Sequence, residues 1–179
     1  MSRSFTLIGG GIIVLAALAA GLHFGYSMRV GEPKPSGPTV LLHTPFTDLT
    51  GDRTTLSQWQ GKRLLVNFWA TWCTPCREEM PLLNRMRAQY AANGVEFIGI
   101  AVDSPEPVQK FVQQLGIGYP IVIGSADALE VIRLLGNKAG GLPYTVLVEP
   151  DGHISRTLLG QIHEQDLLEW LGQPHDPAS

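Results

Sequence analysis

One stretch decides the fold of this 179-residue chain: Val66-Asn67-Phe68-Trp69-Ala70-Thr71-Trp72-Cys73-Thr74-Pro75-Cys76-Arg77-Glu78-Glu79-Met80-Pro81. Residues 64–70 form a nearly continuous apolar run, which predicts a strand covered on both faces. A helix is predicted from about Cys73, because apolar residues then recur every three or four positions, at Met80, Leu83, Met86 and Tyr90. The only two cysteines of the chain therefore stand where a buried strand passes into a helix.

That position predicts redox chemistry for the two cysteines. The free N–H groups and the dipole of a helix N-terminus favour a thiolate over a thiol. We expect Cys73 to be the exposed nucleophile and Cys76, one turn further on, the shielded resolving thiol that displaces a mixed disulfide. Pro75 suits the first turn, where its missing N–H would be unpaired in any case.

Two other interpretations of the cysteine pair agree less well with the sequence. A zinc site needs two more ligands, and the five histidines are scattered along the chain. A purely structural disulfide across so short a loop would stabilise little. The pattern therefore favours a redox dithiol, with no metal and no cofactor.

The sequence on either side predicts an α/β domain with a mixed sheet. A hairpin is expected from Phe46 to Leu49 and from Thr54 to Leu56, around a turn that contains Gly51. Further strands are expected at residues 95–102, 120–123, 144–148 and 154–159, the last two as an antiparallel pair. Further helices are expected to begin at Ser104–Pro105, to run from Ser125 to Leu135, and to run from Gln165 to Leu171.

The N-terminal segment predicts export. Between Arg3 and Arg29 lie 25 residues without a formal charge, which as a helix would reach about 37 Å. A membrane anchor is expected over residues 1–28, although Ala17-Leu18-Ala19 also has the form of a signal-peptide cleavage site. The domain is then expected outside the cytoplasm, at a bacterial inner membrane.

Composition predicts the boundaries of the remaining segments, and charge restricts the kinds of partner that the chain is expected to bind. Residues 29–38 are rich in proline and glycine and predict a linker, followed by a domain at 39–172 and a disordered tail at 173–179. The chain carries 13 Lys and Arg against 16 Asp and Glu, a formal charge of −3, with no basic stripe. Nucleic-acid binding is therefore not expected.

The quoted stretch resembles the active-site segment of the thioredoxin superfamily, and more narrowly the membrane-anchored TlpA/ResA-like thiol-disulfide oxidoreductases. The resemblance covers residues 45–171 and includes the N-terminal hairpin, a strand-helix insertion near 117–136, and the loop Gly141-Leu142-Pro143. It implies a thioredoxin fold, a mixed central sheet flanked by helices. It also implies that Pro143 is cis and faces the dithiol, while the backbone of Leu142 pairs with the substrate chain. Trp72, Thr74 and Pro75 would contact the substrate beside it.

Two further positions concern proton transfer. Asn67 stands where thioredoxins commonly carry a buried aspartate, and an amide cannot accept a proton. Glu79 lies three residues after Cys76, on the same helical face, and matches a glutamate of ResA-like proteins. It is the candidate proton acceptor for Cys76, with a raised pKa; the alternative is a solvated first-turn glutamate. Pro81 is expected to kink the helix.

The resemblance implies an enzyme that reduces disulfides of exported proteins and is itself recharged by a membrane thiol donor. Thr-Pro between the cysteines lacks the histidine of strongly oxidising relatives, which favours the reductase direction. Apocytochrome c is a typical substrate of the family. The cytochrome-maturation branch, however, usually has Gly-Ala-Pro-Glu-Thr where this chain has Gly-Leu-Pro-Tyr-Thr, so that substrate stays open.

Three other functions fit the sequence less well. A thiol peroxidase of this fold carries Pro and Thr or Ser at the positions of Val66 and Ala70. A copper-delivery module needs a C-x-x-x-C pattern and a placed histidine. A disulfide isomerase usually has a dimerisation domain, for which no sequence is left over, so a monomer is expected.

Overall fold

A computed structural model describes residues 37–174 of the chain. The predicted anchor, most of the predicted linker and residues 175–179 lie outside the described residues. The strands are β1 (Phe46–Asp48), β2 (Arg53–Thr54), β3 (Arg63–Trp69), β4 (Val95–Ala101), β5 (Ile121–Ile123), β6 (Tyr144–Val148) and β7 (Ile154–Leu159). The helices are α2 (Gly37–His43), α3 (Thr74–Tyr90), α4 (Pro105–Leu115), α5 (Ala126–Leu134) and α6 (Glu164–Leu171), with short 3-10 turns η1 (Leu56–Trp59) and η2 (Ala91–Asn93).

The described strands form one mixed sheet in the order β2-β1-β5-β4-β3-β6-β7. The central strand β3 pairs in parallel with β4 and antiparallel with β6, and β4 pairs in parallel with β5. β6 and β7 form the expected antiparallel pair, and β1 and β2 the expected hairpin. The carboxyl ends of β3, β4 and β5 therefore meet at one edge of the sheet, where the two cysteines follow β3.

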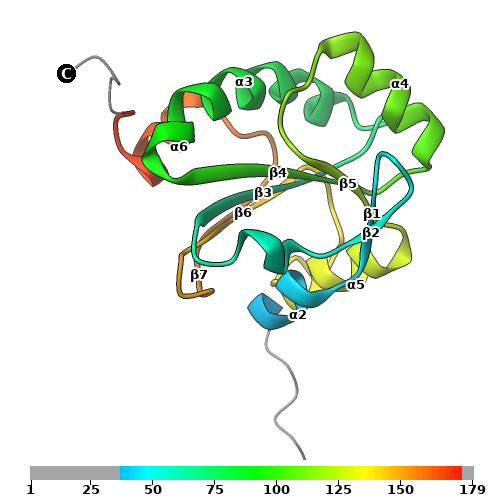
Figure 1. The fold of residues 1–179 in the computed structure, drawn as a ribbon, viewed down its shortest axis with the longest axis horizontal. Helices are drawn as coiled ribbons and strands as arrows, with labels where there is room; N and C mark the ends of the chain where they lie inside the picture. Colours follow the sequence, from blue (N-terminus) through cyan, green and yellow to red (C-terminus); the bar gives the residue numbers. More distant parts are fainter. Residues whose placement is uncertain (1–36, 175–179) are drawn as a thin grey trace, which may run out of the picture. The chain divides into compact units, whose positions relative to one another are not determined.

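Helices cover both faces of the sheet, with α3, α4 and α6 on one side and α2 and α5 on the other (Figure 1). Because successive side chains of a strand point to opposite faces, β3 contributes to both cores. Leu65 and Trp69 pack beneath α3, whereas Val66 and Phe68 pack toward α2 and α5. The same alternation turns Asn67 toward α3, which is the face that carries the site.

The structure differs from the sequence prediction near the amino end of the domain. Helix α2 begins at Gly37, within the segment predicted as a linker, and the domain therefore begins earlier than residue 39. Its Leu41 and Leu42 are buried in the core beside α5. That burial stabilises the helix, which no periodic apolar pattern in the sequence predicts. Leu56 opens the turn η1 instead of ending a strand, since β2 ends at Thr54, and the Leu56 side chain is fully buried.

The remaining elements follow the sequence closely. Ser104 is the N-cap residue of α4, and Pro105 is its first residue. Pro81 lies inside α3, which runs from Thr74 to Tyr90, and the kink expected at Pro81 stays a prediction. The predicted strand-helix insertion is present as β5 and α5. In residues 37–174 every helix is too short or too polar to cross a bilayer.

Candidate active site

Cys73 and Cys76 are joined by a disulfide at the start of α3. Cys73 is the N-cap residue in extended backbone conformation, and Pro75 lies in the first turn, as expected. The prediction that Cys73 is exposed is wrong for this oxidised form, in which Cys73 is 6% exposed and Cys76 fully buried. The reason is the disulfide itself, because it ties the Cys73 sulfur to a residue that packs in the core beside Met80. Cys73 is still the more exposed of the two cysteines, as predicted.

The Leu142-Pro143 peptide bond is cis, as the resemblance implied. Because Phe68 pairs with Tyr144, this loop lies beside the carboxyl end of β3, from which the cysteine loop departs. Within the described residues, the Leu142 backbone N–H and C=O have no hydrogen-bond partner, and the side chain is half-buried. Those two groups are thus available to pair with an extended chain.

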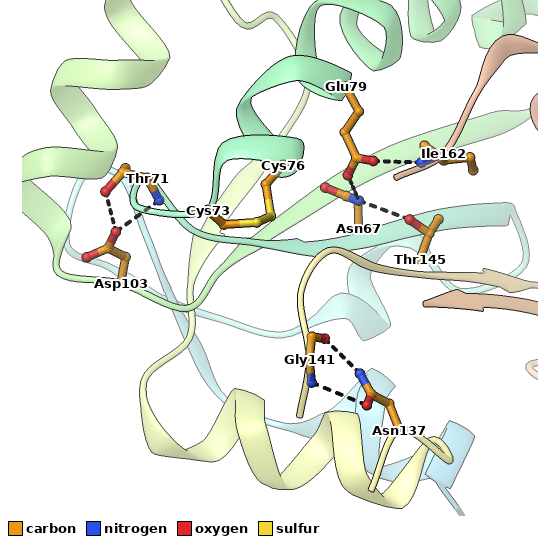
Figure 2. Close-up of a disulfide and its surroundings, with 10 residues drawn as sticks. All are labelled: Asn67, Thr71, Cys73, Cys76, Glu79, Asp103, Asn137, Gly141, Thr145 and Ile162. Atoms are coloured by element: carbon orange, nitrogen blue, oxygen red, sulfur yellow. Dashed lines mark hydrogen bonds between the residues drawn. A yellow bond between two sulfur atoms is a disulfide. The ribbon is translucent and has the colours of Figure 1, made fainter. Parts of the chain in front are cut away.

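An asparagine that the sequence did not single out holds the cis-proline loop. The Asn137 side chain donates from Nδ2 to the Gly141 carbonyl at 2.8 Å, and its Oδ1 accepts from the Gly141 N–H at 3.3 Å (Figure 2). On the other side of the loop, the Pro143 carbonyl accepts from the Gly160 N–H at 2.9 Å. An asparagine directly after Gly136, at the end of α5, is the only local signal for this role.

Glu79 is 1% exposed and lies on the inner side of the disulfide, beneath α3 (Figure 2). Its Oε1 accepts a hydrogen bond from Asn67 Nδ2 at 2.7 Å, and its Oε2 accepts from the Ile162 N–H at 2.8 Å. Asn67 Nδ2 also donates to Thr145 Oγ1 at 3.0 Å. The solvated alternative for Glu79 is therefore wrong, because the position three residues after Cys76 faces the core and not water.

Burial raises the pKa of Glu79 to about 7, while the hydrogen bonds from Ile162 and Asn67 act in the opposite direction. Both donors are neutral groups, so they stabilise the Glu79 carboxylate less than a cation would and only partly offset the effect of burial on its pKa. The predicted raised pKa is confirmed. A group with a pKa near neutrality can both accept and return a proton at physiological pH.

A second carboxylate supports the loop that precedes Cys73. Asp103, two residues after β4, accepts hydrogen bonds at Oδ2 from the Thr71 N–H at 3.0 Å and from the Thr71 hydroxyl (Figure 2). Its Oδ1 accepts from the Ser104 N–H at 2.7 Å. Sequence reasoning missed this residue, because only the parallel pairing of β3 and β4 places the two loops side by side.

The remaining predicted site residues lie around the disulfide. Trp72 is 68% exposed, Thr74 is exposed and Pro75 is half-buried, so all three are accessible to a substrate. Trp69, the last residue of β3, is fully buried and packs against Phe111 of α4 with ring centroids 5.6 Å apart. Within residues 37–174, no three His, Cys, Asp or Glu side chains are grouped so as to hold a metal ion.

Comparison with known proteins agrees with this geometry. The model of the AhpC/TSA family matches residues 38–157. The chain belongs to the AhpC/TSA family. Within the thioredoxin superfamily it is TlpA/ResA-like. The thiol-disulfide oxidoreductase ResA of Geobacillus thermodenitrificans is 35% identical over 166 residues, covering 89% of each chain. ResA of Halalkalibacterium halodurans is 37% identical over 161 residues, again covering 89% of each.

A solved structure gives the same result for the fold of this AhpC/TSA member. The thiol:disulfide interchange protein of Chlorobium tepidum TLS superposes with a TM-score of 0.60 at 26% identity, covering 80% of this chain and 99% of that one. The mixed sheet with its flanking helices is thus a thioredoxin fold, as predicted. The relatives and the Cys73–Cys76 pair together assign the enzyme class, thiol-disulfide oxidoreductase.

Proposed function

We propose that this enzyme reduces disulfides of exported proteins, working outside the cytoplasm from a membrane anchor in residues 1–28. One observation carries the proposal of a substrate-reducing dithiol. The Cys73–Cys76 disulfide begins the helix that also carries the buried Glu79 carboxyl, and the cis-proline loop beside the end of β3 leaves the Leu142 backbone without a hydrogen-bond partner among the described residues. The Leu142 backbone can pair with a polypeptide, and the Glu79 carboxyl can accept the proton of the Cys76 thiol.

The reaction starts from the reduced dithiol. The Cys73 thiolate, favoured by the N-terminus of α3, attacks one sulfur of the substrate disulfide and releases the other as a thiolate, which takes up a proton from water. Glu79 accepts the proton of the Cys76 thiol. The Cys76 thiolate then attacks Cys73 Sγ, expels the second substrate thiolate, and closes the disulfide seen here. Two electrons pass to the substrate, and a membrane thiol donor must return them.

The narrower role of reducing apocytochrome c has less support from this chain. Tyr144 follows the cis-proline where the cytochrome-maturation branch usually has glutamate. The Tyr144 side chain is buried, and its hydroxyl donates to the Leu135 carbonyl at 2.7 Å. This position therefore offers no polar group to a substrate.

A trapping experiment tests the roles of the two cysteines. With Cys76→Ser the mixed disulfide on Cys73 cannot be resolved, so a disulfide-bearing substrate should accumulate in a covalent, thiol-reversible adduct. The matched Cys73→Ser variant should form none. Adducts of equal yield on both variants would contradict the assignment.

The reduction potential of the pair tests the direction of the reaction. A value near that of thioredoxin, about −270 mV, is expected for a reductase in equilibrium with a dithiothreitol series. A value near about −120 mV would instead mark a protein that inserts disulfides. Protease treatment of spheroplasts that carry the full chain, in which the outer face of the inner membrane is open to the protease, tests its location, since a domain protected there would overturn the proposed side.

A further inference from the structure

A hollow of about 600 Å³ lies beside the disulfide, at the edge where the parallel strands end. Its apolar lining residues are Trp72 of the cysteine loop, Val102 after β4, Pro105 of α4, Ile123 at the end of β5, and Leu129 of α5. Two of those wall residues belong to the strand-helix insertion. Such a volume lies within the range of small ligand pockets and is ample for an aromatic side chain.

The hollow adjoins the surface at which the substrate backbone is proposed to pair. Leu129 Cδ2 lies within 3.8 Å of the point where a Cβ on Gly140 would be, directly before Gly141 and Leu142. At the other end, the hollow is bounded by Trp72, the neighbour of Cys73 in the chain. A substrate held at Leu142 with its sulfur at Cys73 therefore passes along the rim.

The wall favours an uncharged occupant. Among the residues that the structure describes, Asp103 is the only charged one that lines the hollow. Both of its oxygens already accept hydrogen bonds, from Thr71 and from the Ser104 N–H. An acidic side chain placed there would be repelled by the Asp103 carboxylate, and the lining is mostly apolar side chain, which favours an apolar occupant. The 68% exposed Trp72, by contrast, offers an apolar ring to an arriving side chain.

We propose that this hollow receives an aromatic or branched apolar side chain of the disulfide-bearing polypeptide, within two residues of the attacked cysteine. The inference rests on the proposed disulfide reduction and adds the feature by which substrates are selected. The insertion β5–α5 supplies two of the five apolar lining residues, Ile123 and Leu129, and so sets the selectivity. An extended chain advances about 3.3 Å per residue, which keeps such a side chain within reach of the rim.

The test compares two disulfide-bridged peptides that differ only in Phe or Ser two residues from the cysteine. The full chain is reduced first, and its rate of oxidation by each peptide is measured. The Phe peptide should react at least about tenfold faster, as expected for burial of one aromatic side chain. Leu129→Lys should bring the ratio of the two rates close to one. Leu134→Lys is the matched control, because Leu134 is 50% exposed on the same helix and does not line the hollow; it should keep the wild-type ratio.

Equal rates in the wild-type protein, or a preference that survives Leu129→Lys, would overturn the proposal. If Leu129→Lys does not fold, Leu129→Ala replaces it and should reduce the ratio several-fold. A dimer of the wild-type chain that Leu129→Lys dissociates would show that a second copy covers the hollow and would also overturn it. Failure of the wild-type protein to reduce hydroxyethyl disulfide, which has no flanking side chains, would refute the proposed function instead.

Discussion

Asn67 Nδ2 donates to Glu79 Oε1 at 2.7 Å, in a position where both side chains are 1% exposed. The pair joins the central strand to the helix that carries the disulfide. Within the described residues, the other amide atom, Asn67 Oδ1, has no partner. The neutral amide of Asn67 thus occupies the position at which thioredoxins commonly carry an aspartate. The carboxyl group of the site is supplied by Glu79 of α3 instead.

Glu79→Gln should remove a pH dependence of stability. The pKa of Glu79 is about 7 in the folded oxidised protein, against an ordinary value of 4.5 for the unfolded chain, so between these pH values the folded state binds more protons than the unfolded state. The stabilisation is complete below about pH 4.5 and is lost as the pH rises through about 7, by about 3 kcal/mol in all. Chemical unfolding of the oxidised protein across this range measures it.

Glu79→Gln is a conservative change. Its amide can accept from Ile162 and donate to Asn67 Oδ1 after a flip of the Asn67 amide. Glu149 has a lowered pKa, which acts in the opposite sense at lower pH, so the difference between wild type and variant isolates Glu79. Parallel stability curves for the two proteins would show that Glu79 does not titrate in this window.

Asn67→Asp should couple two carboxyl groups. The new carboxylate would lie against Glu79, and two like charges at this distance share one proton. The upper apparent pKa of the pair should then rise above the value of about 7 for Glu79 alone. Carbon-13 NMR titration of the oxidised protein measures both steps. Thr145→Val, which leaves the Asn67–Glu79 bond in place, should move the titration less; independent titrations in Asn67→Asp would contradict the coupling.

Asp103→Ala should destabilise the loop before Cys73. It leaves the N–H groups of Thr71 and Ser104 without their acceptor, at a cost of about 1–3 kcal/mol for a partly buried donor. Urea unfolding gives the loss. Thr71→Val removes only the hydroxyl donor and keeps the N–H bond, so its effect should be smaller. A larger loss in Thr71→Val than in Asp103→Ala would show that Asp103 does not support this loop.

Gly124→Ala should strain the junction between β5 and α5. A Cβ there would lie 2.5 Å from Ala128 Cβ and 3.0 Å from Ile100 Cγ2, and an alanine methyl cannot rotate away. Overpacking of this kind typically costs about 1–3 kcal/mol. Gly118→Ala, whose Cβ would meet only Asn84 Oδ1 at 3.6 Å, should change thermal stability little. Equal losses in both variants would contradict this origin.

Much of the site follows from local patterns. The apolar run of β3, the periodicity of α3 and the helix-start position of Cys73 are features of neighbouring residues, and they predict the redox centre. Three-residue spacing likewise places Glu79 on the face of Cys76. The prolines and glycines before Leu41 favoured a linker, in contrast, because the burial of Leu41 depends on α5, nearly 90 residues further on.

The amino-acid sequence by itself determined the α/β order of the elements, the position of the dithiol at a helix N-terminus, and, through resemblance, the cis-proline loop. Only the tertiary structure decided the surroundings of those groups. Thr145 reaches Asn67 from 78 residues away, Ile162 reaches Glu79 from 83, and Asp103 reaches Thr71 from 32. The pKa of a side chain and its hydrogen-bond partners depend on which residues surround it in the folded protein. The periodicity of residues along the chain does not specify those neighbours.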